Sequence, residues 1–132
     1  MSTIEATTTS ESGYTSVSRV GEYELTIDAT NSDGPNPNEV LVVDYASCFV
    51  PALRVGAQKA GHDDLGRVEV DISAELDDDD DLTSVAFDIA IEADLSESEI
   101  ANIVERAEDI CHVHDALRDE LHAEIDVTPD AF

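Results

Sequence analysis

Two cysteines, Cys48 and Cys111, are the residues in this 132-residue sequence best suited to covalent chemistry. A thiolate attacks electrophiles and binds metals, whereas a free buried cysteine otherwise behaves as a small hydrophobic residue. Pro51 lies three residues after Cys48 and predicts a kink in the surrounding helix, because proline removes a backbone N–H. Asp44 lies one helical turn before Cys48 on the same face. An irregular helix with a polar residue beside the thiol favours a functional role for Cys48.

Two other groups of residues are candidate metal ligands. Cys111, His112 and His114 place three ligands of the type that zinc prefers within four residues. A closed zinc site normally takes a pair of ligands from each of two places, and only this place has a pair, so zinc binding stays an alternative. The acidic run Asp77–Asp81 lacks the spacers that let calcium ligands converge. We expect its side chains to point apart and the run to form a solvated turn.

The chain is strongly acidic, with 32 Asp and Glu residues, 6 Lys and Arg residues and a formal net charge of −26. Such a charge repels nucleic acids and anionic membrane surfaces, so neither is an expected partner. The acids are spread along the chain and only one lysine, Lys59, is present. This composition indicates adaptation to high salt, because molar salt reduces the Debye length to roughly 3 Å. We therefore expect the cytoplasm of a halophile that accumulates salt.

The N-terminal sequence lacks the basic and apolar regions of a signal peptide, which agrees with a cytoplasmic location. No transmembrane helix is expected either. The most apolar stretch, Val40–Ala57, is interrupted by Asp44 and Arg54 and is shorter than the roughly 20 clean residues that a span requires.

Hydrophobic periodicity predicts an α+β chain with a flexible segment over residues 1–13 and one domain over residues 14–132. Asn36 and Gly61 have the residue types of a helix N-cap and of the position after a helix C-terminus. The helix between them is apolar on nearly every face, which predicts burial. The other expected elements are a hairpin over Tyr14–Asp28, strands over Gly66–Leu76 and Leu82–Ala93, a helix from Ser96 to Cys111, a short helical stretch over His112–Leu121 and a strand over Ala123–Val127.

Two segments carry a resemblance to a known family. GPNPNEVLVVDYASCF resembles the motif that leads into the first cysteine of the OsmC/Ohr family, the osmotically inducible protein C and organic hydroperoxide resistance proteins. ICHVHDAL resembles the second motif of that family, Cys-x-Val-x-x-x-Leu. The resemblance covers residues 14–128, and the chain is more similar to the broader OsmC-like members than to the dedicated hydroperoxide reductases. It implies an intertwined homodimer of α+β subunits around a long buried helix.

The resemblance also implies a thiol-dependent peroxidase that needs no cofactor. Cys48 would then be the peroxidatic cysteine that attacks a hydroperoxide, and Cys111 the resolving cysteine that forms a disulfide with it. A thiol or dithiol reductant would restore both thiols. The hydroperoxide branch of the family uses an arginine from the N-terminal strands, for which Arg19 is the candidate, oriented by a Glu at the position of Asn38.

The acid next to that position, Glu39, is expected to cap the helix, because nine residues place it about opposite Cys48. The absence of the family's Glu motivates an alternative, a non-catalytic OsmC-like binding domain, including a zinc-binding version that uses Cys111, His112 and His114. In either case we expect an obligate homodimer with the thiols at or near the subunit interface, because each buried Leu or Val contributes about 1.5–3 kcal/mol.

Overall fold

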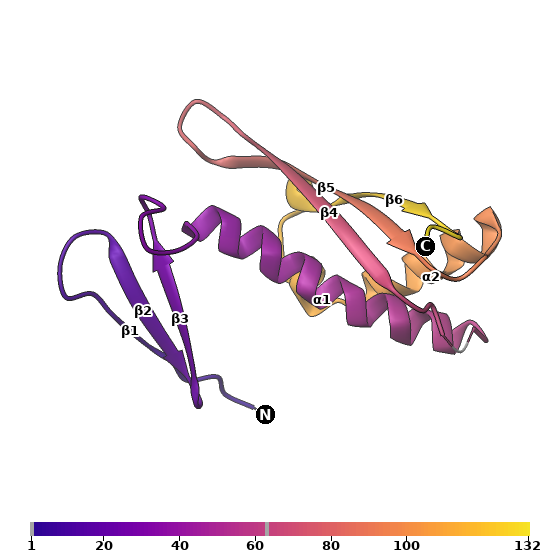
Figure 1. Cartoon of the computed structure of the whole chain (residues 1–132), viewed down its shortest axis with the longest axis horizontal. Coiled ribbons are helices and arrows are strands. Elements are labelled where there is room, and N and C mark those ends of the chain that lie inside the picture. The colour runs from indigo at the N-terminus through magenta and orange to yellow at the C-terminus, as the bar shows by residue number, and fades with distance from the viewer. Residues whose placement is uncertain (1, 63) are drawn as a thin grey trace. The chain divides into compact units, whose positions relative to one another are not determined.

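The computed structural model describes residues 2–62 and 64–132, which form two compact units. The first unit ends at Leu41 and the second comprises Val42–Phe132, so the boundary lies inside helix α1 (Pro37–Lys59). Figure 1 labels the elements in chain order. The predicted absence of structure over residues 1–13 is wrong for Thr7–Thr9, which form strand β1. That residues 14–132 behave as one domain stays a prediction.

The first unit contains an antiparallel sheet of three strands in the order β1-β2-β3. Strand β2 (Thr15–Val20) pairs along its whole length with β3 (Tyr23–Asp28), which confirms the predicted hairpin. Strand β1 pairs with β2 from Thr7, opposite Arg19, to Thr9, opposite Val17. The Ser- and Thr-rich start of the chain therefore adds a strand that its polar composition did not reveal.

A buried carboxylate organises the loop between β3 and α1. Asp28 is 1% exposed and accepts hydrogen bonds from the Thr15 hydroxyl, the Thr30 N–H and hydroxyl, and the Asp33 N–H, at 2.7–3.0 Å. The Thr30 hydroxyl contributes most to a pKa of Asp28 well below its usual range, because all these donors favour the carboxylate. The loop is thus held by polar contacts and leads directly to the start of α1.

The ends of α1 lie where the sequence predicts them. Asn36 Oδ1 accepts the Glu39 N–H and Glu39 Oε1 accepts the Asn36 N–H, both at 2.9 Å, which is the expected capping box. The helix continues through Pro51 to Lys59. Gly61 then adopts a φ of 92°, a conformation that residues with a side chain rarely adopt. The capping role predicted for Glu39 is confirmed.

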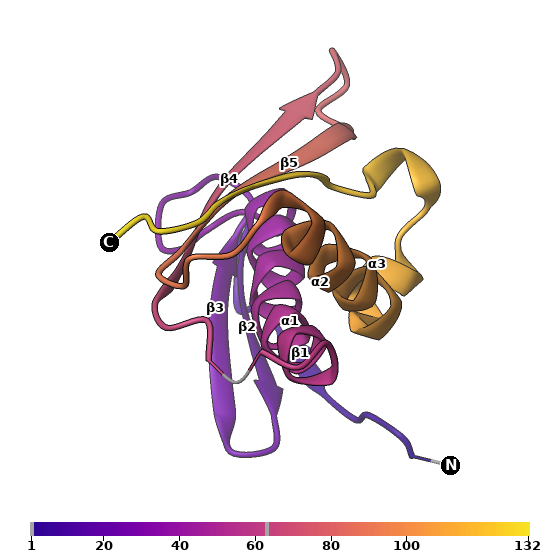
Figure 2. The same ribbon diagram turned by 90° about the vertical axis from the view of Figure 1, so that its right-hand side faces the viewer.

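The second unit packs helices on a sheet with the strand order β4-β5-β6. Strands β4 (Val68–Leu76) and β5 (Leu82–Ile91) form an antiparallel hairpin, and β6 (Glu124–Thr128) joins β5 in parallel. Both views show β6 alongside β5 (Figures 1 and 2). The crossover from β5 to β6 contains helix α2 (Glu97–Ile110), whose N-terminus has the predicted capping box of Ser96 and Glu99.

One face of α1 forms the centre of the core of the second unit. Its buried residues are Tyr45, Ala46, Phe49, Ala52, Leu53, Gly56 and Ala57. A Cβ at Gly56 would lie 3.1 Å from the Ile103 carbonyl oxygen, so the absence of a side chain lets α1 and α2 approach closely. The opposite face is not covered within the single chain, where Val43 is 54% and Val55 38% exposed, so burial on nearly every face, which requires a second subunit, stays a prediction.

Helix α1 is also the one helix among the described residues that is long and apolar enough to cross a membrane, judged by length and composition alone. Core helices of soluble proteins pass the same test. Tyr45 and Phe49 of α1 are fully buried against the sheet, with ring centroids 4.7 and 5.7 Å from that of Phe87. This packing is that of a core helix.

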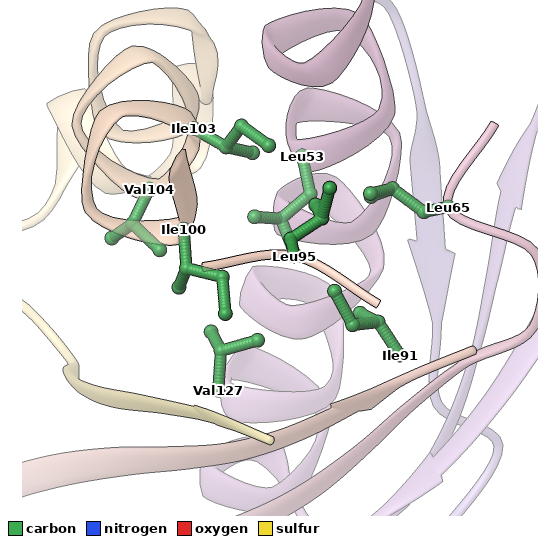
Figure 3. A pocket seen from close by; sticks show the side chains of 8 residues that line it. All are labelled: Leu53, Leu65, Ile91, Leu95, Ile100, Ile103, Val104 and Val127. Carbon is green, nitrogen blue, oxygen red and sulfur yellow. The ribbon is translucent and has the colours of Figure 1, made fainter. Parts of the chain in front are cut away.

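An apolar cavity of about 10 Å³ lies among α1, α2, β5 and β6. Figure 3 shows aliphatic side chains around it: Leu53, Leu65, Ile91, Leu95, Ile100, Ile103, Val104 and Val127. A space of this size is about that of one water molecule, and nothing in its lining hydrogen-bonds to water. The cavity is therefore a packing defect of the core, too small for an organic substrate.

Candidate active site around two cysteines

The structure brings the two cysteines together from distant parts of the sequence. Cys48 lies in the middle of α1 and is partly exposed, while Cys111 lies between α2 and α3 (His112–Ala116) and is 1% exposed. The thiols are close enough to interact by hydrogen bonding as well as electrostatically. Both are free. The pair thus combines one thiol that solvent can reach with one enclosed by the core.

Burial, together with a smaller contribution from the Cys48 thiol, raises the pKa of Cys111 to about 11. The opposing influence comes from the start of α3, where Cys111 Sγ accepts the His114 N–H at 3.4 Å and so caps the helix. Desolvation is the larger effect. Cys111 is therefore a neutral thiol at physiological pH, able to donate a proton but not to attack a peroxide by itself.

A buried polar network lies beside this thiol, and sequence analysis did not identify it as such. Tyr45, which is fully buried, has its hydroxyl 2.6 Å from His114 Nδ1 and accepts the Ala123 N–H at 2.9 Å. His114 stacks on His122 with ring centroids 3.9 Å apart. Burial raises the pKa of Tyr45, and the neighbouring Cys111 adds to the rise.

The spacing of these residues was a usable signal. Tyr45 precedes Cys48 by three residues in α1, and His114 follows Cys111 by three residues. Residues three apart share one face of a helix, so Tyr45 lies on the same face of α1 as Cys48, while Cys111 is the N-cap of α3 and His114 is the third residue of that helix. The sequence analysis considered His114 only as a zinc ligand.

The charged residues named from the sequence are exposed or have partners of their own. Arg19 is exposed on β2 in the first unit, where its Nε donates to Glu24 at 2.8 Å. Asp44 is exposed on α1. The hydrogen bond from the Asn36 N–H is the main cause of a lowered pKa of Glu39, which identifies that carboxylate as part of the cap.

The predicted zinc ligands do not converge. In the part of the chain that the structure describes, the ligand atoms of Cys111, His112 and His114 form no group within 4.8 Å. His112 is exposed, and His114 is buried with Nδ1 on the Tyr45 hydroxyl. The zinc alternative is thus not supported by the arrangement of these residues.

Three side chains of the acidic turn Asp77–Asp81 lie closer together than the sequence predicts. Carboxylate oxygens of Asp77, Asp79 and Asp81 lie within 4.8 Å of one another, so the prediction that the side chains of this run point apart is wrong for these three. Asp77 Oδ1 accepts the N–H groups of Asp79 and Asp81 at 2.9 and 3.0 Å. All three residues are exposed, and these bonds account for the turn as a local backbone structure.

Comparisons with known proteins agree with the fold. A family model described as OsmC-like protein matches residues 29–126. An uncharacterized protein of Haloferax volcanii is 59% identical over 132 residues, which is 100% of both chains. The crystal structure of an OsmC-like protein from Mycoplasma pneumoniae has a TM-score of 0.84 at 17% identity and covers 97% of both chains.

A second solved structure has the same fold. The organic hydroperoxide resistance protein OhrB of Bacillus subtilis has a TM-score of 0.70 at 21% identity, covering 96% of this chain and 98% of its own. The α+β architecture, with two small sheets and a long helix between them in sequence, is thus that of the OsmC and Ohr structures. The chain belongs to the OsmC-like protein family.

Proposed function

We propose that this protein is a thiol-dependent peroxidase that reduces organic hydroperoxides with Cys48 and Cys111, in defence against oxidative stress. The observation that carries the proposal is the asymmetric thiol pair. Cys48 is partly exposed in the middle of α1, and the neutral Cys111 thiol lies next to it in the core. The names of family neighbours such as the Bacillus subtilis hydroperoxide resistance protein point to the same chemistry.

The reaction has two steps on the protein. The Cys48 thiolate attacks one oxygen of the hydroperoxide, the O–O bond breaks, and the alkoxide takes a proton and leaves as the alcohol, so Cys48 becomes a sulfenic acid. The Cys111 sulfur then attacks the Cys48 sulfur, and its proton leaves with the hydroxide as water. A disulfide is formed, which a thiol or dithiol reductant returns to two thiols by exchange.

The first step requires a cation to favour the Cys48 thiolate, and Arg19 is our candidate. It lies on β2 and pairs with Glu24, with about half of each side chain exposed. Such exposed pairs contribute little, typically 0–1 kcal/mol, so the guanidinium can change partners at low cost. Arg19→Ala should therefore slow the oxidation of Cys48, whereas Arg67→Ala, a matched control at another exposed ion pair, should not.

A homodimer is part of the proposal. The first unit exposes large apolar side chains, including Ile4 at 88%, Tyr23 at 76% and Leu25 at 50%, and α1 exposes Val43. Covering such side chains contributes about 1.5–3 kcal/mol for each one fully buried. A second copy of the chain is the proposed cover. A folded monomer of 14.2 kDa in light scattering at micromolar concentration in molar KCl would contradict this assembly.

Turnover measurements test the peroxidase activity. Consumption of cumene hydroperoxide with dithiothreitol as reductant should be lost in Cys48→Ser and strongly reduced in Cys111→Ser. The control is Ser47→Ala, a change at a neighbouring exposed position on α1, and this variant should turn over as the wild type does. Equal activity in wild type and Cys48→Ser would exclude the proposed chemistry.

The second candidate function is a non-catalytic OsmC-like binding domain. Its support is Asn38, which stands in the first turn of α1 at the position where the family resemblance calls for Glu. Under this function the purified, reduced protein binds but does not consume hydroperoxides, and Asn38→Glu is the variant expected to gain turnover. Activity in the wild type would eliminate this candidate.

We also propose that the protein functions in the cytoplasm of a salt-accumulating cell. The net charge of −26 on 132 residues supports this setting, since charges of one sign repel unless salt screens them. Cytoplasmic thiols are kept reduced, as the reaction requires before each turnover.

A further inference from the structure

The second step of the proposed reaction depends on how Cys111 is held. Helix α3 has only five residues, His112–Ala116, and such a short helix gains its stability from contacts with the rest of the fold. Its main polar anchor is His114, which is 8% exposed and lies 2.6 Å from the Tyr45 hydroxyl. Tyr45 belongs to α1, one turn before Cys48. The anchor thus ties the segment with Cys111 to the turn with Cys48.

His114 makes a second bond that reaches the resolving cysteine itself. Its backbone N–H donates to Cys111 Sγ at 3.4 Å, while its ring is held by Tyr45. One residue therefore connects the phenol of Tyr45 to the sulfur of Cys111. A shift of the His114 ring would move the N–H that holds this sulfur.

The protonation pattern of the network follows from its donors and acceptors. The Tyr45 oxygen already accepts the Ala123 N–H at 2.9 Å, and the phenolic proton needs an acceptor in this buried place. We assign His114 Nδ1 as that acceptor, which leaves the proton of the neutral ring on Nε2. Nε2 lies 3.8 Å from Glu108 at the edge of an open pocket of about 400 Å³.

We propose that Tyr45 and His114 are positioning residues that hold Cys111 ready for attack on the oxidised Cys48, so that they set the rate of disulfide formation and not the rate of the peroxide reaction. The inference rests on the proposed peroxidase function. An intramolecular attack is fast only when the reacting atoms are held in line, and a displacement of about 1 Å can cost roughly 100-fold. The new sulfur–sulfur bond has a length of about 2.05 Å, which leaves little tolerance in the position of Cys111.

Acid should disrupt the same arrangement. A protonated His114 has a hydrogen on Nδ1, so the Tyr45 phenol loses its acceptor. Burial lowers the pKa of His114, and so does His122, whereas nearby carboxylates raise it. The titratable groups that face His114 are Tyr45, Glu105, Glu108, Asp109, Cys111, Asp115 and His122. Disulfide formation should therefore be fast at neutral pH and slow below the lowered pKa of His114.

The test follows both steps in one experiment. Reduced protein is mixed with one equivalent of cumene hydroperoxide, samples are quenched with dimedone, which traps sulfenic acid, and intact mass is measured over time. In Tyr45→Phe the sulfenic acid should persist about 10- to 100-fold longer than in the wild type. Loss of Cys48 thiol should keep its wild-type rate within about twofold. The variant keeps the Tyr45 ring, whose packing on Phe49 and Phe87 supports the fold.

Two further variants separate positioning from general damage. Tyr14→Phe removes a hydroxyl from a tyrosine that is 74% exposed in the first unit, and both steps should keep their wild-type rates. His114→Asn places an amide oxygen near the position of Nδ1, so it should retain fast disulfide formation at neutral pH while removing the slowing at acid pH. A structural role alone would not produce that change in pH profile.

The outcomes are distinct. Disulfide formation at the wild-type rate in Tyr45→Phe, or an unchanged pH profile in His114→Asn, would overturn the positioning role while leaving the peroxidase intact. If Cys111→Ser forms no dimedone adduct with the hydroperoxide, the proposed function itself fails, and the inference fails with it.

Discussion

The unit that ends at Leu41 has one buried residue among those that the structure describes, the carboxylate Asp28, whereas the unit Val42–Phe132 buries an apolar core that includes Phe49 and Phe87. In the first unit, order comes from hydrogen bonds to a charge and from strand pairing. In the second, it comes from packing around α1 and the removal of apolar surface from water. The difference teaches that the two cysteines lie in the part of the chain with its own apolar core, while the first unit leaves its large apolar side chains exposed, which is the surface that the proposed homodimer would cover.

Core truncation should give the largest contrast between the units. Phe87 is fully buried in the second unit, so Phe87→Ala should lower the free energy of unfolding by about 3–5 kcal/mol. Tyr23, 76% exposed in the first unit, contacts little of its own chain, and Tyr23→Ala should weaken homodimer association instead. Urea unfolding in molar KCl, with light scattering, measures both effects. Similar losses of chain stability in the two variants would break the comparison.

Salt should act on the whole chain through its charge of −26. Reducing KCl from about 1 M to about 0.1 M lengthens the Debye length from roughly 3 to 10 Å, so the carboxylates repel one another over longer distances. We expect the midpoint of thermal unfolding to fall steadily over this range, as circular dichroism would record. A midpoint that is independent of KCl would contradict the proposed adaptation to salt.

The buried charge of the first unit should make its stability depend on pH. The pKa of Asp28 is lowered in the folded state, mainly by the Thr30 hydroxyl, so its contribution is complete above the unfolded value of about 3.9 and is lost as the pH falls below it. Asp28→Asn should be less stable than wild type at pH 7, and the difference should shrink toward pH 3. An equal difference in stability between wild type and Asp28→Asn at both pH values would show that the negative charge of Asp28 does not contribute to the stability of the first unit.

The two helix caps offer the smallest and best matched test. Asn36 caps α1 in the first unit and Ser96 caps α2 in the second, each within a capping box. Ser96→Ala and Asn36→Ala should each cost about 1 kcal/mol, because each removes an acceptor for one backbone N–H. The Asn36 amide also donates to Asn31 at 3.1 Å, so Asn36→Ala should cost slightly more. Urea unfolding of the two single variants provides the comparison.

Local sequence signals predicted most of the fold. Capping residues located the ends of α1 and the start of α2, and alternation located β4 and β5, because these signals act within a few residues. Strand β1 was missed because Thr7–Thr9 has no apolar alternation and depends on its pairing with β2. The apolar faces of α1 predicted a helix that one chain cannot cover alone, but hydrophobicity does not say which side the chain itself covers.

The candidate site was predictable only in part. The family motifs identified Cys48 and Cys111, and the structure places the two thiols together. The bond between Tyr45 and His114 joins residues 69 apart in sequence, and no local pattern encodes such a pairing. The zinc hypothesis failed for a related reason, since adjacent positions in sequence do not make ligand atoms converge. His112 is exposed while His114 is held in the core.

The central claim is that Cys48 and Cys111 act as one redox pair. The most direct measurement is peptide mapping by mass spectrometry after the reduced protein has reacted with one equivalent of cumene hydroperoxide in molar KCl. Our account predicts that both thiols disappear together, that one molecule of alcohol is released per chain, and that the peptides containing Cys48 and Cys111 are joined by a disulfide within one chain. Recovery of both cysteines as free thiols, or a disulfide only between chains, would contradict it.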